Sequence, residues 1–216
     1  MIPIISFIGW QNSGKTTLIQ KIITHLKAQD FRVGVIKATH HENIAFDRPG
    51  SDTDTYSKAG ADSVTLMAPD QMITMTGRPD MKLTDIVNRY FYDFDIVIGE
   101  GFKDERHIAK IEVNRNNSEF LRDQVNGVVA LVTDQHVSGE NIFTADQDIE
   151  LADFIIKTFL HGREQTQTVL YVNGKKVPLK GFVQDALAET VGGFVRTLKK
   201  TANVSDIDLK IRFKEE

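Results

Sequence analysis

Residues 9–16 read Gly9-Trp10-Gln11-Asn12-Ser13-Gly14-Lys15-Thr16 and match the phosphate-binding pattern G-x-x-x-x-G-K-[ST] at every fixed position. An apolar run at residues 4–8 precedes the pattern, as expected for a buried parallel strand. Apolar residues then recur at helical spacing, at Leu18, Ile19, Ile22, Ile23 and Leu26. This strand–loop–helix context favours a phosphate loop over the alternative, a glycine turn capped by a surface lysine.

The residue types of this loop suit a nucleoside triphosphate and Mg²⁺. Gly9 and Gly14 allow several backbone N–H groups to converge on one phosphate, and the following helix directs its positive end at the same anion. Lys15 is expected to reach the outer phosphates, and the Thr16 hydroxyl is expected to bind Mg²⁺. The predicted nucleotide contacts are Gly9, Gln11, Asn12, Ser13, Gly14, Lys15, Thr16 and Thr17.

Composition limits the class of protein. The chain has 216 residues, a formal net charge of -4 and no cysteine, and its pI is near 5.9. These values argue against general binding to nucleic acid or to an anionic membrane, and against disulfides or a thiolate metal site. No apolar run approaches the length of a membrane span, so we expect a cytoplasmic protein without a signal peptide.

Apolar runs alternate with helical patterns after the phosphate loop, which predicts an α/β fold: a doubly wound, mostly parallel sheet. A short helix at residues 56–60 and a hairpin of residues 63–68 and 71–76 are expected to interrupt this alternation. The remaining predicted strands of the main domain are residues 32–38, 95–100, 108–113 and 128–133, and the remaining helices are residues 82–92 and 148–160.

A polar stretch at residues 162–167 predicts a linker between two domains. Residues 1–162 would form the phosphate-loop domain, and residues 163–216 a small α+β module. In the module we predict a strand at residues 169–172, a tight turn at Asn173-Gly174, a helix at residues 182–199 and a final strand at residues 207–213. The module carries no chemical motif, so a dimerisation or docking role is the default interpretation.

Acidic residues outside the loop are candidate metal ligands. Glu100 ends an apolar strand and can hold Mg²⁺ beside the phosphate loop. The alternative is that it is an ordinary carboxylate at the end of a strand. Asp52 and Asp54 lie in a loop after the second strand, where either can bind the metal or cap the next helix. The predicted metal set is Thr16, Asp52 and Glu100, with Lys15, Asp52 and Glu100 as the predicted catalytic group.

Three further positions are candidate ligand contacts. His40, beside His41, can contact an anion, and Lys103 lies within reach of a phosphate or carboxylate, but solvated loop residues are the alternative. Thr133-Asp134 follows an apolar strand, where nucleotide-binding folds often read the base. An aspartate there can accept hydrogen bonds from guanine but not from adenine in the same geometry, so it gives weak support for guanine.

The chain resembles the MobB family of molybdopterin-guanine dinucleotide biosynthesis proteins. Besides the phosphate loop, three stretches carry the resemblance: Lys37-Ala38-Thr39-His40-His41; residues 46–52 with Ala59-Gly60-Ala61; and Gly99-Glu100-Gly101-Phe102-Lys103 with Lys110-Ile111-Glu112-Val113. They extend to about residue 160. Ala38 departs from the family, where a histidine or another polar residue often precedes the Thr-His-His sequence.

The resemblance implies a homodimer that binds GTP and Mg²⁺ and hydrolyses GTP slowly. Its partners would be a MobA-type guanylyltransferase and molybdenum or tungsten oxidoreductases, and the pterin of molybdenum cofactor is a further possible ligand. It implies that Lys15 and Thr16 hold phosphate and metal, that Asp52 and Glu100 complete the metal environment, and that Thr133-Asp134 reads the base. Two alternatives stay open: an ATP-dependent small-molecule kinase or ligase, with His40 or Asp52 as base, and a non-hydrolysing scaffold.

Overall fold

The computed structural model describes residues 2–42, 44–45, 47–77, 81–115, 118–160, 168–173, 175–199, 201, 204, 207–211 and 213. The chain forms two compact units, one from Ile2 to Leu160 and one containing the residues from His161 onward. The predicted linker and the boundary after residue 162 fall largely at residues 161–167, outside the described residues. That boundary therefore stays a prediction.

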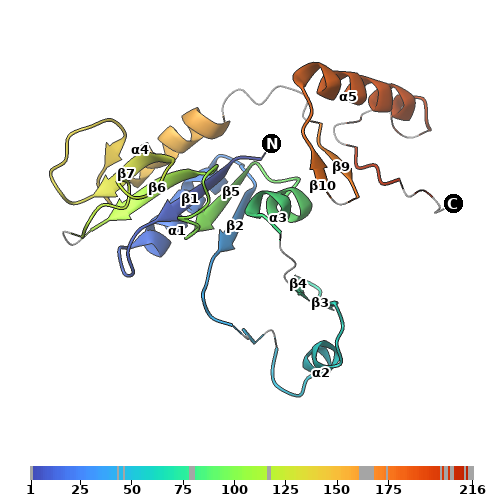
Figure 1. The fold of residues 1–216 in the computed structure, drawn as a ribbon, viewed down its shortest axis with the longest axis horizontal. Helices are drawn as coiled ribbons and strands as arrows, with labels where there is room; N and C mark the ends of the chain where they lie inside the picture. The colour runs from blue at the N-terminus through green and yellow to red at the C-terminus, as the bar shows by residue number, and fades with distance from the viewer. Residues whose placement is uncertain are drawn as a thin grey trace. The chain divides into compact units, whose positions relative to one another are not determined.

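The first unit is built on a six-stranded sheet in which every neighbouring pair of strands is parallel (Figure 1). The strand order is β2-β5-β1-β6-β7-β8. The predicted parallel α/β sheet is confirmed, with one short strand, β8, that the sequence pattern missed. The strands are β1 (Ile4–Ile8), β2 (Val33–Lys37), β5 (Ile96–Glu100), β6 (Ala109–Asn114), β7 (Val128–Thr133) and β8 (Ile142–Phe143).

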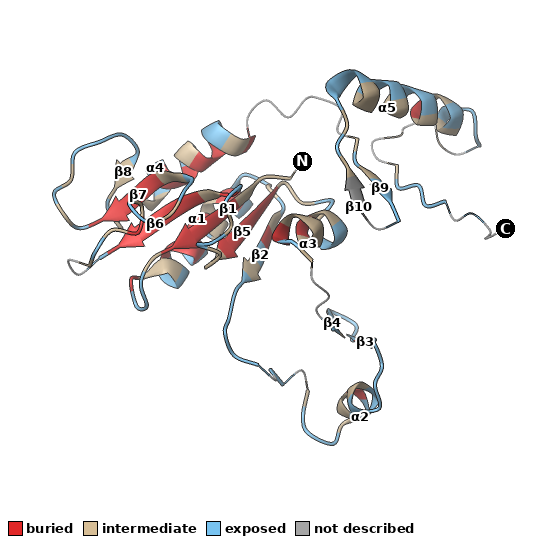
Figure 2. Cartoon of the chain, in the orientation of Figure 1, coloured by how far each residue is buried: buried red, intermediate tan, exposed pale blue. Residues whose placement is uncertain are grey.

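Helices cover both faces of this sheet. The larger core contains α1 (Lys15–Ala28) and α4 (Asp148–Ile155), with the π-helical turn η1 (Ile156–Leu160) continuing α4. The smaller core packs α3 (Leu83–Tyr90) against β5 on the other face. Figure 2 shows buried residues concentrated in the central strands and in the helix faces that cover them. None of the helices in the described residues is long and apolar enough to cross a membrane.

Strand register sets where the functional residues gather. In the parallel pairing, β1 places Phe7 opposite Glu100 of β5 and Ile8 opposite Glu112 of β6. The carboxyl ends of β2, β5, β1, β6 and β7 therefore meet at one edge of the sheet, where ligands of open α/β sheets bind.

A segment between β2 and α3, which we call the arm (residues 47–77), forms its own small sheet and contributes no strand to the six-stranded sheet (Figure 1). It contains α2 (Asp52–Lys58) and an antiparallel hairpin of β3 (Ser63–Met67) and β4 (Met72–Thr76). The predicted hairpin is confirmed. The predicted start of the helix at residue 56 is wrong, because the helix begins four residues earlier, at Asp52. Ser51 caps it and accepts a hydrogen bond from the backbone N–H of Asp54 at 3.3 Å.

The second unit contains the hairpin of β9 (Leu170–Val172) and β10 (Lys175–Val177), followed by α5 (Gly181–Arg196). The predicted strand at residues 207–213 is wrong, because residues 207–211 and 213 have no strand conformation. Alternating apolar residues form a strand only beside a partner. In the described part of this unit, β9 and β10 pair only with each other.

Candidate nucleotide site

The backbone of residues 9–16 has the shape of a phosphate loop. Gly9 and Gly14 have φ values of 151° and 89°, and Asn12 has a φ of 61°. A Cβ atom on Gly9 would lie 2.2 Å from the carbonyl oxygen of Val113 in β6. Only glycine fits at that position, because the loop leaves β1 directly against the end of β6.

Lys15 folds back across this loop. Its Nζ donates to the carbonyl oxygens of Gly9 at 3.0 Å and Trp10 at 2.6 Å. Burial lowers the pKa of Lys15, while the charge of Glu100 raises it and that of Lys37 lowers it. Lys15 begins α1, where the first backbone N–H groups of the helix have no side-chain cap. An ammonium there is well placed to bind phosphate oxygens, and a bound anion would favour its charged form.

Thr16 and Glu100 form the centre of the predicted metal site. Thr16 Oγ1 lies 3.2 Å and 3.1 Å from the two carboxylate oxygens of Glu100. Lys37 Nζ, at the end of β2, forms an ion pair with Glu100 Oε1 at 3.0 Å. A hydroxyl and one carboxylate are suitable Mg²⁺ ligands when phosphate oxygens and waters supply the rest, so the residues present fit this ion.

Asp52 is not brought to this pair. It is the exposed first residue of α2, on the arm. The nearby Asp54 stabilises the start of α2 within the arm. Its Oδ2 accepts from the backbone N–H of Gly50 and from Lys58 Nζ, both at 2.7 Å. The hydrogen bond from Gly50, followed by that from Lys58, lowers the pKa of Asp54. Asp54 thus has a structural role, and the metal role of Asp52 stays a prediction.

The turn after Glu100 is fixed by contacts with neighbouring strands. Ser6 Oγ donates to the carbonyl oxygen of Gly101 at 2.5 Å, and Gly101 has a φ of 102°. A Cβ on Gly101 would lie 3.1 Å from that of Ala38, so the departure at Ala38 provides a small residue at a tight contact. Lys103 and His40 are both exposed beyond the ends of β5 and β2, and their ligand roles stay predictions.

The proposed base-reading residues lie at the carboxyl end of β7, Thr133 as its last residue and Asp134 just after it, and they differ in exposure. Thr133 is buried, and its hydroxyl accepts from the backbone N–H of Gln135 at 3.1 Å. Asp134 is exposed. Gln135 Nε2 donates to Asn114 Oδ1 at 2.8 Å, which ties the end of β7 to the end of β6. Of the two predicted residues, Asp134 is therefore the one that lies at the surface.

Buried polar residues of β6 position the loop that follows this strand. Glu112 is fully buried, and its carboxylate accepts from the backbone N–H groups of Leu121 at 2.7 Å and Arg122 at 2.8 Å. Lys110, also fully buried, donates to three backbone carbonyl oxygens, those of Glu105, Ile108 and Asn126. Both residues, which belong to one of the stretches that carry the resemblance described above, thus order loops instead of facing a ligand.

Two residues near the loop were missed as site residues. Lys37 pairs with Glu100, and Arg115 directly follows β6 beside the phosphate loop. Each lies at the carboxyl end of a strand, which is the available sequence signal. The order of the strands, which brings these ends to the loop, is not readable from their sequence.

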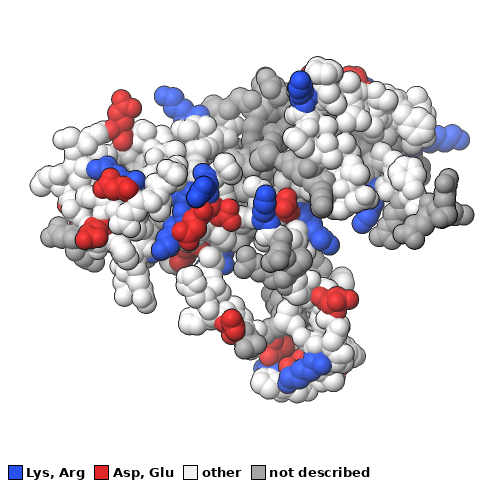
Figure 3. Space-filling view, in the orientation of Figure 1, with Lys and Arg blue, Asp and Glu red and all other residues white. Residues whose placement is uncertain are grey.

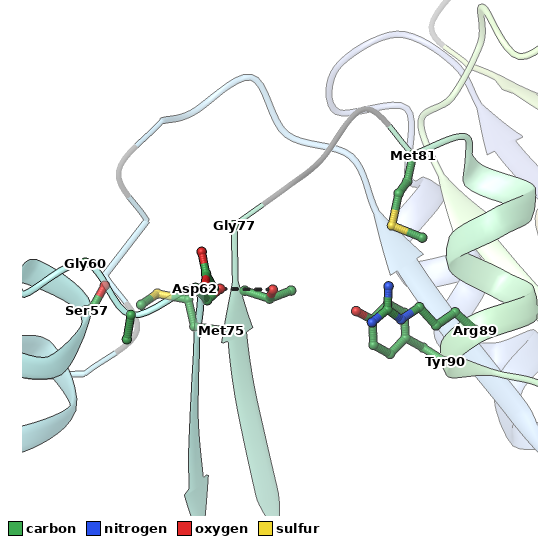
Figure 4. Close-up of a pocket in the computed structure, with 10 residues that line it drawn as sticks. Ser57, Gly60, Asp62, Met75, Gly77, Met81, Arg89 and Tyr90 are labelled. Carbon is green, nitrogen blue, oxygen red and sulfur yellow. Dashed lines mark hydrogen bonds between the residues drawn. The ribbon is translucent and has the colours of Figure 1, made fainter. Parts of the chain in front are cut away.

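An open hollow of about 690 Å³ lies between the arm and α3. Figure 4 shows Asp62, Met75 and Gly77 of the arm on one side and Arg89 and Tyr90 of α3 on the other. It contains none of the predicted site residues, so it is separate from the phosphate loop. Elsewhere on the surface, Figure 3 shows acidic and basic side chains interspersed on the visible face.

A parallel α/β sheet whose first strand leads through a glycine-rich loop and Lys15 into a helix defines the P-loop class of proteins. The chain matches the family described as "MobB: Molybdopterin guanine dinucleotide synthesis protein B" over residues 4–134. It belongs to the MobB family.

Relatives show how much of the chain the family shares. The "Molybdopterin-guanine dinucleotide biosynthesis adapter protein" of Escherichia coli (strain K12) is 33% identical over 165 residues, covering 73% of this chain and 93% of the relative. A relative from Methanocaldococcus jannaschii is 26% identical over 235 residues, covering 96% of this chain and 97% of the relative. Most of the second unit is therefore shared with this archaeal relative.

The fold also resembles a solved MobB structure. The "Crystal Structure of molybdopterin-guanine biosynthesis protein B (mobB)" superposes with a TM-score of 0.61 at 27% identity, covering 73% of this chain and 99% of that one. The chain thus contains a whole MobB fold and additional C-terminal elements.

Proposed function

We propose that this protein is an adapter in molybdopterin-guanine dinucleotide biosynthesis that binds Mg²⁺–GTP at residues 9–16. The E. coli relative carries that adapter description. The observation that carries the nucleotide part is the contact of Thr16 Oγ1 with both Glu100 carboxylate oxygens, beside Lys15. These groups suit a nucleotide's phosphates and their metal ion.

The proposal includes a weak GTPase activity. The loop contains one glutamine, Gln11, which is poorly suited to orient a water because it lies within the loop itself. The adapter would assist a MobA-type guanylyltransferase in attaching GMP to the pterin of molybdenum cofactor, for use by molybdenum or tungsten oxidoreductases, in the cytoplasm. The pterin itself is a further proposed ligand.

A homodimer is also part of the proposal, and the exposed arm hairpin supports it. Four apolar residues of β3 and β4 are 41% to 78% exposed: Leu66, Met67, Met72 and Ile73. The hairpin is a separate two-stranded sheet, and such a sheet is marginally stable alone in water. A second copy of the chain would cover this apolar surface.

Calorimetric titration with Mg²⁺–GTP and Mg²⁺–ATP tests the nucleotide part, on the wild type and on Asp134→Ala. We expect GTP to bind at least about tenfold more tightly, corresponding to about 1.4 kcal/mol, and Asp134→Ala to lose this preference. Equal or tighter binding of ATP would contradict the proposal and favour a kinase or ligase. Glu140→Ala, another exposed acid, is the matched control and should keep the preference.

A further inference from the structure

Arg115 lies at the edge of the sheet where the phosphate loop begins. It is the first residue after β6, the parallel neighbour of β1. Because Ile8 pairs with Glu112, the chain beyond β6 runs beside the chain leaving β1. The strand order puts Glu100 of β5 on one side of the phosphate loop and Arg115 on the other.

The side chain of Arg115 lies against the phosphate loop. A Cβ atom placed on Gly14 would be 3.3 Å from Nη1 and 3.8 Å from Cδ of Arg115. Gly14 is the N-cap of α1, where the first backbone N–H groups of the helix are available to an anion. Arg115 is exposed, and among the described residues its guanidinium has no carboxylate partner within ion-pair distance.

The backbone that carries Arg115 is held on both sides. Its carbonyl oxygen accepts from Ser118 Oγ at 3.0 Å. Asn114 Nδ2 donates to the carbonyl oxygen of Glu119 at 2.9 Å, and Trp10 Nε1 donates to the same oxygen at 2.8 Å. The carbonyl oxygen of Glu119 therefore links the phosphate loop to the loop after β6. This link fixes the position of the Arg115 backbone relative to the phosphate loop.

We propose that Arg115 is a second cationic contact for the phosphates of a bound nucleotide, opposite the Glu100 side of the loop. This inference rests on the proposed function, namely that residues 9–16 bind nucleotide. A guanidinium presents a planar set of donors that matches two phosphate oxygens, whereas the Lys15 ammonium acts as a point charge. Together they would counter the negative charge of the phosphates beside the helix N-terminus.

Binding of Mg²⁺–GTP and of magnesium pyrophosphate to the full chain tests this assignment. Pyrophosphate has neither base nor sugar, so it isolates the phosphate contact. We expect Arg115→Ala to weaken both ligands by about 10- to 100-fold, the range for hydrogen bonds to charged groups, and Arg115→Lys to weaken them less. The matched control is Arg106→Ala, which removes an exposed arginine just before β6, at the opposite edge of the sheet, and should leave both affinities unchanged.

The outcomes separate this inference from the proposed function. If wild type binds neither GTP nor ATP, the proposed function fails and this inference fails with it. If wild type binds but Arg115→Ala matches Arg106→Ala, only the assignment of Arg115 is overturned. Weaker GTP binding with unchanged pyrophosphate binding would also overturn it, because Arg115 would then contact the nucleoside. Thermal unfolding of all variants identifies any loss that comes from misfolding.

Discussion

The Thr16 hydroxyl lies 3.1 Å and 3.2 Å from the carboxylate oxygens of Glu100, a residue 84 positions away in the sequence. The parallel pairing of β1 with β5 brings them together, because it places Phe7 opposite Glu100 just before the chain turns into the phosphate loop. Lys37 completes the group through its ion pair with Glu100 at 3.0 Å.

Replacing Glu100 by glutamine should remove the Mg²⁺ dependence of nucleotide binding. The amide keeps the shape of the side chain but loses the negative charge that attracts the ion. We expect wild type to bind GTP more tightly with Mg²⁺ than with EDTA. The ratio of these two affinities should be about tenfold smaller in Glu100→Gln. Titration calorimetry in both buffers measures it. Glu140→Gln, an exposed acid, should behave as wild type, and an unchanged Mg²⁺ effect in Glu100→Gln would contradict the metal role.

Replacing Gly9 by alanine should destabilise the first unit. The new Cβ would meet the Val113 carbonyl oxygen at 2.2 Å, and the φ of 151° is unfavourable for alanine. We expect a loss of roughly 2–4 kcal/mol in the free energy of unfolding, measured by urea denaturation. Gly77→Ala is the control, because a Cβ there meets nothing within 4 Å. Equal stability of the two variants would show that the loop is not packed against β6.

Replacing Asp148 by asparagine should weaken the contact between α1 and α4. Asp148 accepts from Lys21 Nζ at 2.8 Å and from His25 Nε2 at 2.9 Å. The hydrogen bond from Lys21, followed by that from His25, lowers the pKa of Asp148. We expect the variant to lose roughly 1 kcal/mol of the free energy of unfolding at neutral pH.

The pH dependence of this loss has a defined sign. An acid whose pKa is lower in the folded protein stabilises the fold above its unfolded pKa, about 3.9 for aspartate. The difference between wild type and Asp148→Asn should therefore be full at neutral pH and shrink as the pH falls through the lowered pKa. Asp153→Asn, an exposed acid on the same helix, should show little difference. A difference that persists at the lowest pH would rule out this charge as the cause.

Charged residues on the arm hairpin should prevent the proposed dimer. Met67 and Met72 are opposite each other in the hairpin and are 78% and 66% exposed. Replacing both by glutamate puts two charges in an apolar surface that a second copy would bury. Light scattering after gel filtration should find wild type dimeric and the double variant monomeric. Ile149→Glu, at an exposed apolar site on α4, should stay dimeric; a monomeric wild type would contradict the proposal.

Local sequence patterns correctly predicted the elements that depend mainly on residues close to them in the sequence. The phosphate loop, α1 and the hairpin of β3 and β4 were identified because glycine placement and the periodicity of apolar residues are local properties. A prediction failed where strand formation depends on a partner. Residues 207–211 alternate like a strand, but no strand of the described part of the chain pairs with them. The helix α2 begins earlier than the predicted residue 56, because the Ser51 cap outweighs the apolar pattern that begins at Tyr56.

The sequence by itself determined the class of loop, its lysine and threonine, the parallel α/β fold and the family. The sequence also predicted that Glu100 lies beside that loop, as the structure has it. Only the tertiary structure showed that Lys37 and Arg115 lie there too and that Asp52 belongs to the arm. The physical reason is strand order. Hydrophobic periodicity specifies that a strand is buried, but long-range pairing in the sheet specifies its neighbours and so the side chains that share an edge.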